Sequence, residues 1–290
     1  MKPAAFEYLK PTTLENVLSL LAQHGSSAKL IAGGQSLVPM MNFRLATPEI
    51  LIDINGLSSL DFVRREGDSL RIGARATHAV LADSTLVRQL CPLMSEAYKY
   101  VAHATVRNRG TLCGNLAHAD PASEMPAVML AVNATLVIRN ATAERLIPAK
   151  EFFQGLYATA ITPVEMLVEV RIPATPRLTG YAFEEVSSRQ GDFAMGLVAA
   201  IVEVRGDLIN SAAVSFAGFS DRAYRLEAVD DLLKGKKPSD SLFLDAAEAA
   251  IALIDISQDA HADREYRCDL IRTLTRRTLA KAVTRATSNA

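Results

Sequence analysis

Short apolar runs separated by turn-forming residues divide the first part of the chain into a strand–helix series. Apolar positions at helical spacing predict a helix that follows a capping box of Thr12 and Glu15 and runs to about residue 23. Three apolar runs predict strands: residues 6–9, 29–32 and 50–54. We therefore expect residues 1 to about 57 to form a small βαβ-like subdomain.

The next stretch predicts a second subdomain, over residues 58–175. Helical periodicity covers residues 77–100, with breaks at Ser84 and Pro92. Apolar runs predict a hairpin around Gly67 and two later strands: residues 60–63, 69–72, 134–138 and 166–172. A Pro-rich segment, residues 173–176, then marks a boundary between two domains, which we place at residues 1–175 and 176–290.

The remaining residues predict a three-stranded antiparallel sheet followed by helices. A strand near residues 181–186 precedes a hairpin of residues 197–204 and 209–216, which turns at Gly206. Three helical patterns follow: residues 222–233, 239–254 and 262–287. Strands and helices that are grouped in this way indicate an α+β fold.

Two glycine-bearing loops carry the candidate chemistry. Residues 32–37 have the sequence Ala-Gly-Gly-Gln-Ser-Leu, and residues 111–116 have the sequence Thr-Leu-Cys-Gly-Asn-Leu. Glycines let backbone amides approach a phosphate without a Cβ in the way, and we expect a bulky residue at Gly33 to block that approach. Two such loops indicate one extended ligand, such as a dinucleotide, held at two places. The alternative is an ordinary turn after a strand and a long surface loop.

The first loop is neither a P-loop nor a Rossmann fingerprint. No Gly-Lys-Ser/Thr follows it, and no third glycine opens a helix at the required spacing. Residues 38–44 can instead begin with a helical turn whose free amides help to neutralise a pyrophosphate.

With the flanking segments Arg-Leu-Ala-Thr-Pro (residues 44–48) and Asp-Pro-Ala-Ser-Glu-Met-Pro (residues 120–126), the loops resemble the FAD-binding medium subunit of molybdenum hydroxylases. This family includes the flavoprotein subunits of carbon monoxide dehydrogenase and quinoline oxidoreductase and the middle domain of xanthine dehydrogenase. The resemblance covers essentially the whole chain. It implies a two-subdomain FAD-binding fold of the vanillyl-alcohol-oxidase/PCMH type, followed by a C-terminal flavoprotein domain.

The resemblance also implies which residues contact FAD. The first loop wraps the pyrophosphate, the second packs against the flavin and its ribityl-phosphate arm, and Asp120 lies toward the ribose or adenine. Small apolar contacts and a stacked ring, which lacks the hydroxyl of the tyrosine in relatives, complete the flavin site. The implied cofactor-binding residues are Ala32, Gly33, Gly34, Gln35, Ser36, Leu37, Val101, Ala102, Thr111, Gly114, Asn115, Asp120 and Phe193.

Cys113 departs from the family pattern, because many relatives have Thr-x-Gly-Gly-Asn at this point. If the position needs a positive φ, Cys113 is strained by about 1–3 kcal/mol. If the glycine only served a close approach, Cys113 fits with a small shift. A thiol beside a flavin can be redox-active, although a buried free cysteine more often behaves as a small hydrophobe.

Composition excludes several classes of protein. A formal net charge of −1 gives no basis for binding nucleic acid or an anionic membrane. The N-terminus lacks the apolar core of a signal peptide, and the longest apolar runs, about six residues, are far short of the ~20 of a spanning helix. The three cysteines cannot form a disulfide framework and indicate a cytoplasmic protein. They are also too few for an iron–sulfur cluster, and the five histidines have no paired metal spacing, so we expect no metal on this chain.

Several charged and titratable residues have two interpretations. The predicted last helix has either a solvated basic face or a docking surface for an acidic partner; its basic residues are Arg264, Arg267, Arg272, Arg276, Arg277, Lys281 and Arg285. The histidines His78, His103 and His118 are more often structural than catalytic. His118 lies within the second motif and is the one to test.

The leading hypothesis is an electron-relay subunit. The resemblance implies a small iron–sulfur subunit and a large molybdenum subunit as partners, which carry the iron–sulfur clusters and the molybdenum–pterin cofactor, in a dimer of heterotrimers. Electrons pass from the molybdenum subunit through the clusters to FAD and then to an external acceptor, and no side chain of this chain acts as a catalyst. The substrate is bound on the molybdenum subunit, and the motifs are most similar to those of the N-heteroaromatic hydroxylases.

Two alternatives stay open. One is a self-contained flavin oxidase or reductase of the same fold, which needs a general base near the flavin, such as His118 or Glu124. The other is an assembly module that has lost FAD, for which Cys113 is the one supporting feature.

Overall fold

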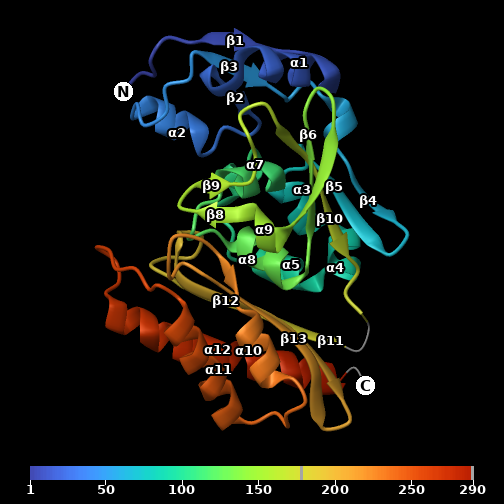
Figure 1. The fold of residues 1–290 in the computed structure, drawn as a ribbon, viewed down its shortest axis with the longest axis vertical. Coiled ribbons are helices and arrows are strands. Elements are labelled where there is room, and N and C mark those ends of the chain that lie inside the picture. Colours follow the sequence, from blue (N-terminus) through green and yellow to red (C-terminus); the bar gives the residue numbers. More distant parts are fainter. Residues whose placement is uncertain (177–178, 289–290) are drawn as a thin grey trace.

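Three sheets lie one above another along the long axis of the molecule (Figure 1). The computed structural model describes residues 1–176 and 179–288. The first sheet is parallel, with the order β1-β3-β2: β1 (Glu7–Leu9), β2 (Ala28–Ile31) and β3 (Ile50–Asp53). Because β1 and β2 both run parallel to β3 and are joined by a helix, the predicted βαβ-like arrangement is present.

Helix α1 (Leu14–His24) covers this first sheet and begins one residue later than the capping box predicted. Thr13, and not Thr12, is the N-cap, and its side chain accepts a hydrogen bond from the Asn16 amide. The buried stripe of the helix starts at Leu14, so the first turn must already be formed there. A 3₁₀ turn (Gly25–Ser27) leads into β2, and α2 (Leu37–Asn42) follows the first glycine loop.

The second sheet is antiparallel and has the order β4-β5-β10-β6-β7. Its strands are β4 (Val63–Glu66), β5 (Ser69–Gly73), β6 (Thr135–Arg139), β7 (Glu144–Pro148) and β10 (Met166–Pro173). A 3₁₀ turn (Ser58–Leu60) precedes β4, so the first strand of the predicted hairpin begins at Val63 and not at residue 60.

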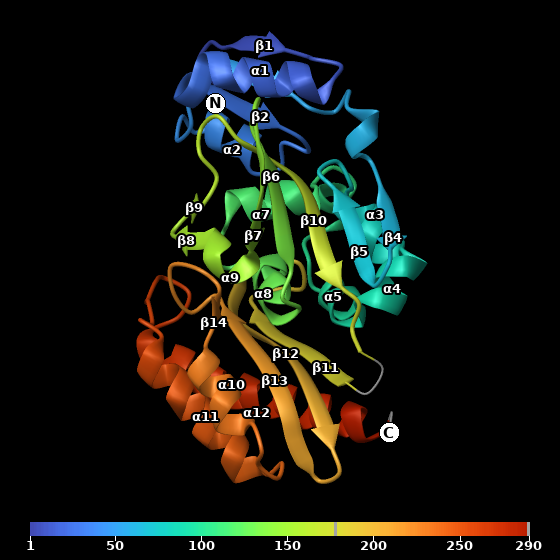
Figure 2. The same cartoon turned by 45° about the vertical axis from the view of Figure 1, so that its right-hand side comes forward.

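Short helices connect the strands of this second sheet. They are α3 (His78–Asp83), α4 (Thr85–Leu90), α5 (Pro92–Ala97), α6 (Ala104–Arg107), α7 (Leu112–His118), α8 (Glu124–Ala131) and α9 (Ala149–Phe152). The predicted breaks at Ser84 and Pro92 separate α3, α4 and α5. A small hairpin of β8 (Phe153–Gly155) and β9 (Ala158–Thr159) lies beside α7 in both views (Figures 1 and 2).

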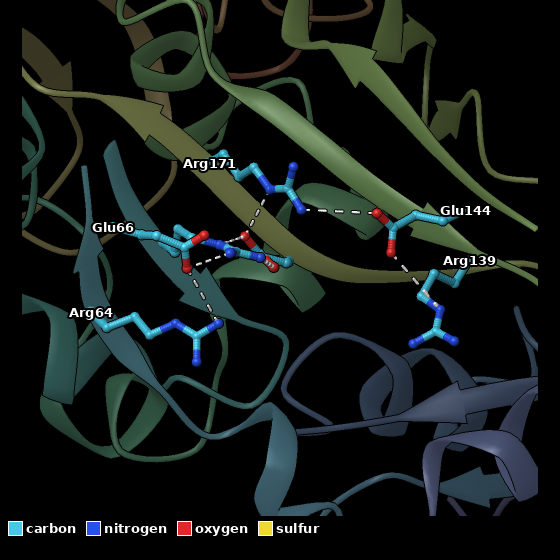
Figure 3. Close-up of polar contacts among 7 residues, drawn as sticks. Arg64, Glu66, Arg139, Glu144 and Arg171 are labelled. Atoms are coloured by element: carbon cyan, nitrogen blue, oxygen red, sulfur yellow. Dashed lines mark hydrogen bonds and ion pairs between the residues drawn. The ribbon is translucent and has the colours of Figure 1, made fainter. Parts of the chain in front are cut away.

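An ion-pair network crosses the second sheet from β4 to β7 (Figure 3). Glu169 lies on the central strand β10 and is bound by Arg71 from β5. Arg171, also on β10, binds it as well, with 3.0 Å between Arg171 Nε and Glu169 Oε1. The remaining members extend the network to both edges of the sheet: Arg64, Glu66, Glu144 and Arg139. Charged side chains thus join all five strands.

The third sheet has four strands and not the predicted three, in the order β11-β12-β13-β14. They are β11 (Thr179–Ser187), β12 (Ala194–Arg205), β13 (Leu208–Ala217) and β14 (Tyr224–Arg225). The additional strand pairs Tyr224 with Phe216, and α10 (Glu227–Leu233) consequently begins five residues later than predicted. The sheet continues into α11 (Asp240–Leu253) and α12 (Arg264–Ser288).

The third sheet is buried on both faces. Neighbouring residues of β11 and β12 alternate between two hydrophobic cores, because successive side chains of a strand point to opposite faces. Phe183 and Leu197 belong to the core shared with the second sheet, whereas Ala182 and Val198 belong to the core under the C-terminal helices. Figure 2 shows α12 lying behind the strands of this sheet. The third sheet is therefore held both to the second sheet and to α12.

Candidate functional site

A cleft of about 1330 Å³ reaches from the first sheet, past the second, to the start of β12. It is larger than the roughly 300–1,000 Å³ of an ordinary small-molecule pocket. All the cofactor-binding residues that the sequence implied line this one cleft. The structure therefore brings together segments that lie up to 161 positions apart in the sequence, from Ala32 to Phe193.

Unpaired backbone amides mark the first loop. Within the described part of the chain, the amides of Gly33, Gly34, Gln35 and Ser36 donate no hydrogen bond to protein. Gly34 has a φ of +70°, a conformation that glycine adopts without strain. Ser36 is the N-cap of α2, yet its hydroxyl accepts no bond from the helix. Successive free amides of this kind form an anion-binding concavity, as a pyrophosphate requires.

At Gly33 the first loop touches the backbone of Arg109 and Gly110, directly before the second loop. A Cβ built on Gly33 would lie 2.0 Å from the Arg109 carbonyl oxygen and 2.7 Å from the Gly110 nitrogen. Both neighbours are backbone atoms, which cannot rotate away. The absence of a side chain at Gly33 is thus needed for the loops to meet, in addition to any role in phosphate access.

A hydrogen-bond network that the sequence did not indicate holds the first loop in place. Asn55 donates from its amide nitrogen to the Ala32 carbonyl oxygen at 2.9 Å and also to Asp53. Tyr8 donates a short hydrogen bond to the other oxygen of Asp53. Burial by itself raises the pKa of Asp53, but the bonds from Tyr8 and Asn55 lower it below its ordinary value. Tyr8 and Asp53 lie on the adjacent parallel strands β1 and β3, and Asn55 directly follows β3. This position in the strand pattern is the one feature of the sequence that could have indicated them.

The second loop is the start of a helix and not an irregular loop. Thr111 is the N-cap of α7, and its hydroxyl accepts a hydrogen bond from the Gly114 amide at 3.1 Å. Asn115 donates to the Ser123 hydroxyl at 2.7 Å, while its own Oδ1 is buried without a partner in the described residues. A buried unpaired acceptor on the wall of a cleft indicates a missing hydrogen-bond donor.

Cys113 lies in the first turn of α7 and has no positive φ, so the possibility of backbone strain is ruled out. Its side chain is 3% exposed, and burial raises the pKa of its thiol. Burial also raises the pKa of the nearby Cys91 thiol, to about 12. Since the thiolate is the reactive form, Cys113 behaves as a small hydrophobe on the cleft wall.

The flavin-contact segments implied by the resemblance form another part of the cleft wall. Arg107 donates to the carbonyl oxygens of Val101 and Ala102 at 2.9 and 2.7 Å, which fixes the turn in which Ala102 has a φ of +43°. Phe193 lines the cleft with 64% of its surface exposed, so its ring is available for stacking. Gly191, with a φ of +89°, shapes the turn that presents this ring.

Asp120, His118 and Tyr157 form a cluster on the cleft wall. The rings of His118 and Tyr157 stack with centroids 5.0 Å apart, and the Tyr157 hydroxyl donates to Asp120 Oδ2 at 3.4 Å. The other Asp120 oxygen accepts from the Ala122 amide. Burial lowers the pKa of His118 and raises that of Glu124, which also lines the cleft, to about 7. His118 is therefore neutral at pH 7, while Glu124 titrates near neutrality.

The basic residues of α12 mostly bind acids of the same chain, which neither interpretation of a basic face anticipated. Arg272 binds Glu248 of α11 at 2.6 Å, and Arg276 binds Asp240, the first residue of α11, at 2.9 Å. The other paired residues are Arg267 with Asp259, Lys281 with Glu96 and Glu184, and Arg285 with Glu96. These pairs leave Arg264 and Arg277 as the members of the set without an ion pair in the described residues.

The described residues contain neither a candidate metal site nor a helix suited to span a membrane. No group of three or more His, Cys, Asp or Glu side chains among them is arranged to hold a metal ion. No helix among them combines the length and the apolar character needed to cross a bilayer.

Comparisons with known proteins agree with this geometry. Residues 4–175 match the family described as the FAD binding domain in molybdopterin dehydrogenase, and residues 181–282 match the CO dehydrogenase flavoprotein C-terminal domain. The chain is 40% identical over 287 residues to the 6-hydroxypseudooxynicotine dehydrogenase complex subunit alpha of Paenarthrobacter nicotinovorans, covering 99% of this chain and 97% of that protein. It is 37% identical over 286 residues to the caffeine dehydrogenase subunit beta of Pseudomonas sp. strain CBB1, covering 98% and 97%.

A solved structure is similar over almost the full length. Carbon monoxide dehydrogenase from Hydrogenophaga pseudoflava, in a form that lacks the Mo-pyranopterin moiety, superposes with a TM-score of 0.96 at 38% identity, covering 98% of this chain and 99% of that one. The fold and the cleft define a flavoprotein of the two-subdomain FAD-binding class. The chain belongs to the family of FAD-binding medium-chain subunits of multi-subunit molybdenum hydroxylases. The resemblance, the fold type and FAD as the cofactor of this chain are thereby confirmed.

Proposed function

We propose that this subunit relays electrons from the iron–sulfur clusters of a partner subunit through FAD to an external acceptor. The observation that carries the proposal is the row of free amides at residues 33–36, facing the same cleft as the unpaired Asn115 Oδ1. Both fit an extended cofactor that has an anionic centre and polar donors. FAD supplies the electron-accepting ring, and the protein supplies binding, orientation and exclusion of water.

Each segment of the cleft has a proposed role. The backbone of residues 32–37 binds the pyrophosphate, and Asn115, with Thr111 and Gly114 at the start of α7, binds the ribityl arm. Val101 and Ala102 contact the flavin edge, and Phe193 stacks on the ring. The Asp120 carboxylate retains lone pairs beyond its two bonds, so it can accept a ribose hydroxyl.

The assembly and the substrate are further parts of the proposal. A small iron–sulfur subunit and a large molybdenum subunit are the partners, in a dimer of heterotrimers, and the substrate is an N-heteroaromatic compound bound on the large subunit. Two relatives that are named for caffeine and 6-hydroxypseudooxynicotine, both nitrogen heteroaromatics, support this substrate class. Free thiols at all three cysteines support a reducing, cytoplasmic location. We also propose domains over residues 1–175 and 176–290, a division that the two matched ranges support.

The first experiment is a flavin titration of the purified chain, followed by native purification of its complex. Asn115→Ala removes the unpaired acceptor, and we expect FAD to bind roughly 3–10-fold more weakly, the value of one hydrogen bond. Asn108→Ala, an exposed asparagine of the neighbouring segment, is the matched control and should bind FAD like the wild type.

The complex then separates the hypotheses. A flavin absorbance band with iron–sulfur absorbance and two further subunits supports the relay. A chain that binds no flavin contradicts it, and a flavin on the isolated chain that a small molecule reduces directly favours the self-contained oxidase.

A further inference from the structure

Glu124 is a buried carboxyl group on the wall of the cleft. It is the first residue of α8, and its surface is 6% exposed. Two hydrogen bonds fix its surroundings: Asn115 donates to the preceding Ser123 at 2.7 Å, and the Ala194 amide donates to the Ala122 carbonyl oxygen at 3.3 Å. Glu124 therefore lies where the second loop meets the start of β12, next to the turn that presents Phe193.

No cation compensates the charge of Glu124. It forms no ion pair within residues 1–176 and 179–288. Burial, with a smaller contribution from the Asp120 charge, raises the pKa of Glu124. Burial, followed by repulsion from Glu124, likewise raises the pKa of Glu185 on β11, whose two oxygens are buried without a hydrogen-bond partner in the described residues. Tyr98, which follows α5, is an uncharged titratable neighbour of Glu124, and His118 ends α7, which packs against α8.

The cations of the other elements packed against α8 are already bound elsewhere. Lys150 of α9 pairs with Glu227 at 3.2 Å. Arg225 of β14 pairs with Asp230 and lies near the Leu130 carbonyl oxygen, at the opposite end of α8 from Glu124.

Burial in this environment disfavours the ionised form of the carboxyl group, which raises the pKa of Glu124 to about 7. The carboxyl group therefore changes its protonation state near neutral pH. A negative charge that develops in the same cleft acts on it at low dielectric, where electrostatic interactions are strong.

We propose that Glu124 takes up a proton when the flavin in this cleft is reduced, and that this uptake adds to the pH dependence of the flavin potential. The inference rests on the proposed function, because it requires FAD in the cleft. Two electrons from the partner's iron–sulfur clusters and one proton leave the flavin ring with one added negative charge. A second proton, from solvent, forms an O–H bond on the Glu124 carboxylate, so the total charge of the cleft is unchanged.

The test is a redox titration of the flavin in the purified complex between about pH 5.5 and pH 9. One proton taken up per two electrons changes a potential by about 30 mV for each tenfold change in proton concentration. Below its pKa Glu124 is protonated in both redox states, so wild type and Glu124→Gln should give parallel lines. Above it, the wild-type potential should fall more steeply than that of Glu124→Gln, by this amount per pH unit.

Glu151→Gln, an exposed glutamate on α9, is the matched control and should follow the wild type. If Glu124→Gln does not retain flavin, Glu124→Asp carries the test: a shorter carboxylate should move the change of slope to another pH, and an unchanged curve contradicts the proposal. Equal pH dependence in wild type and Glu124→Gln overturns this inference and leaves the relay function intact. A wild-type complex without flavin overturns both.

Discussion

Gly33 has no room for even a methyl group, and the obstacle is the backbone of Arg109 and Gly110, directly before the second loop. Its built Cβ lies 2.0 Å from the Arg109 carbonyl oxygen, a separation that real side chains do not reach. The sequence suggested phosphate access as the reason for this glycine. Loop contact is a second reason, and it applies to the protein without its cofactor as well.

We expect Gly33→Ala to destabilise the flavin-free protein by about 1–3 kcal/mol, the cost of forcing extra atoms into a packed site. The displaced loops should also bind FAD more weakly. Thermal unfolding of the flavin-free protein and fluorescence titration with FAD measure the two effects. Gly67→Ala is the control: Gly67 has a φ of +58° and open space around it, so that variant should keep wild-type FAD affinity. Unaltered FAD affinity in Gly33→Ala would show that the contact between the loops is dispensable.

Motif residues could be predicted from the sequence, whereas residues placed by tertiary pairing could not. The glycines, Asn115 and Phe193 lie in short recognisable segments, and the structure gathers them in one cleft. Asn55 and Asp53 reach the first loop only because β3 lies between β1 and β2, and no local pattern encodes that order. Asn55 holds the first loop through a bond to Ala32, a residue that is remote from it in the sequence.

At the scale of elements, strong apolar runs predicted their strands and weak ones did not. Strands β3, β6 and β10 are buried almost throughout and were predicted within a residue or two. Strand β7 is exposed along most of its length and β14 has two residues, so neither carries a periodic signal. Helix α7 was taken for a loop because its seven residues include a glycine and its start coincides with the motif.

The network in Figure 3 contains both buried and exposed charged side chains of one sheet. Glu169, at its centre, has a side chain that is 9% exposed, whereas Arg64 at the edge is 54% exposed. Removing one partner of a buried pair leaves the others uncompensated, so we expect Glu169→Ala to lower the free energy of unfolding by about 3 kcal/mol. Arg64→Ala should change it by less than about 1 kcal/mol. Urea unfolding of both variants measures the difference, and equal effects would mean that burial does not strengthen the network.

At the scale of the whole molecule, Glu96 of α5 forms ion pairs with Lys281 and Arg285 of α12, and we call these pairs the Glu96 clamp. Lys281 and Arg285 bind its two oxygens at 2.7 and 2.5 Å, and Arg285 also donates to the Tyr181 carbonyl oxygen at 2.6 Å. Glu96 lies on α5, which leads through Tyr98 to the cleft wall at Val101, where we propose contacts to the flavin. The last helix thus supports the cleft from the far side of the third sheet.

This clamp should depend on pH. Burial by itself raises the pKa of Glu96, but the bonds from Arg285 and Lys281 lower it below its ordinary value of 4.5. The stabilisation is therefore complete above about pH 4.5 and is lost as the pH falls through the lowered pKa. We expect Glu96→Gln to cost about 3 kcal/mol at pH 7 and progressively less below pH 4, measured by unfolding at several pH values. Glu248→Gln, which breaks an exposed pair with Arg272, should have a smaller effect. A cost for Glu96→Gln that stays constant across this range would contradict the assignment.

The sequence separation of the clamp has a consequence for the order of folding. Glu96 and Arg285 are 189 residues apart, so their contact closes one of the longest loops in the chain. Contacts of such separation form late, because their loop-closure entropy must be met first, and domains fold as units from the N-terminus during synthesis. The cleft loops can therefore assemble on the nascent chain. The ion pairs of Glu96 with Lys281 and Arg285 can form only after α12 has been synthesised.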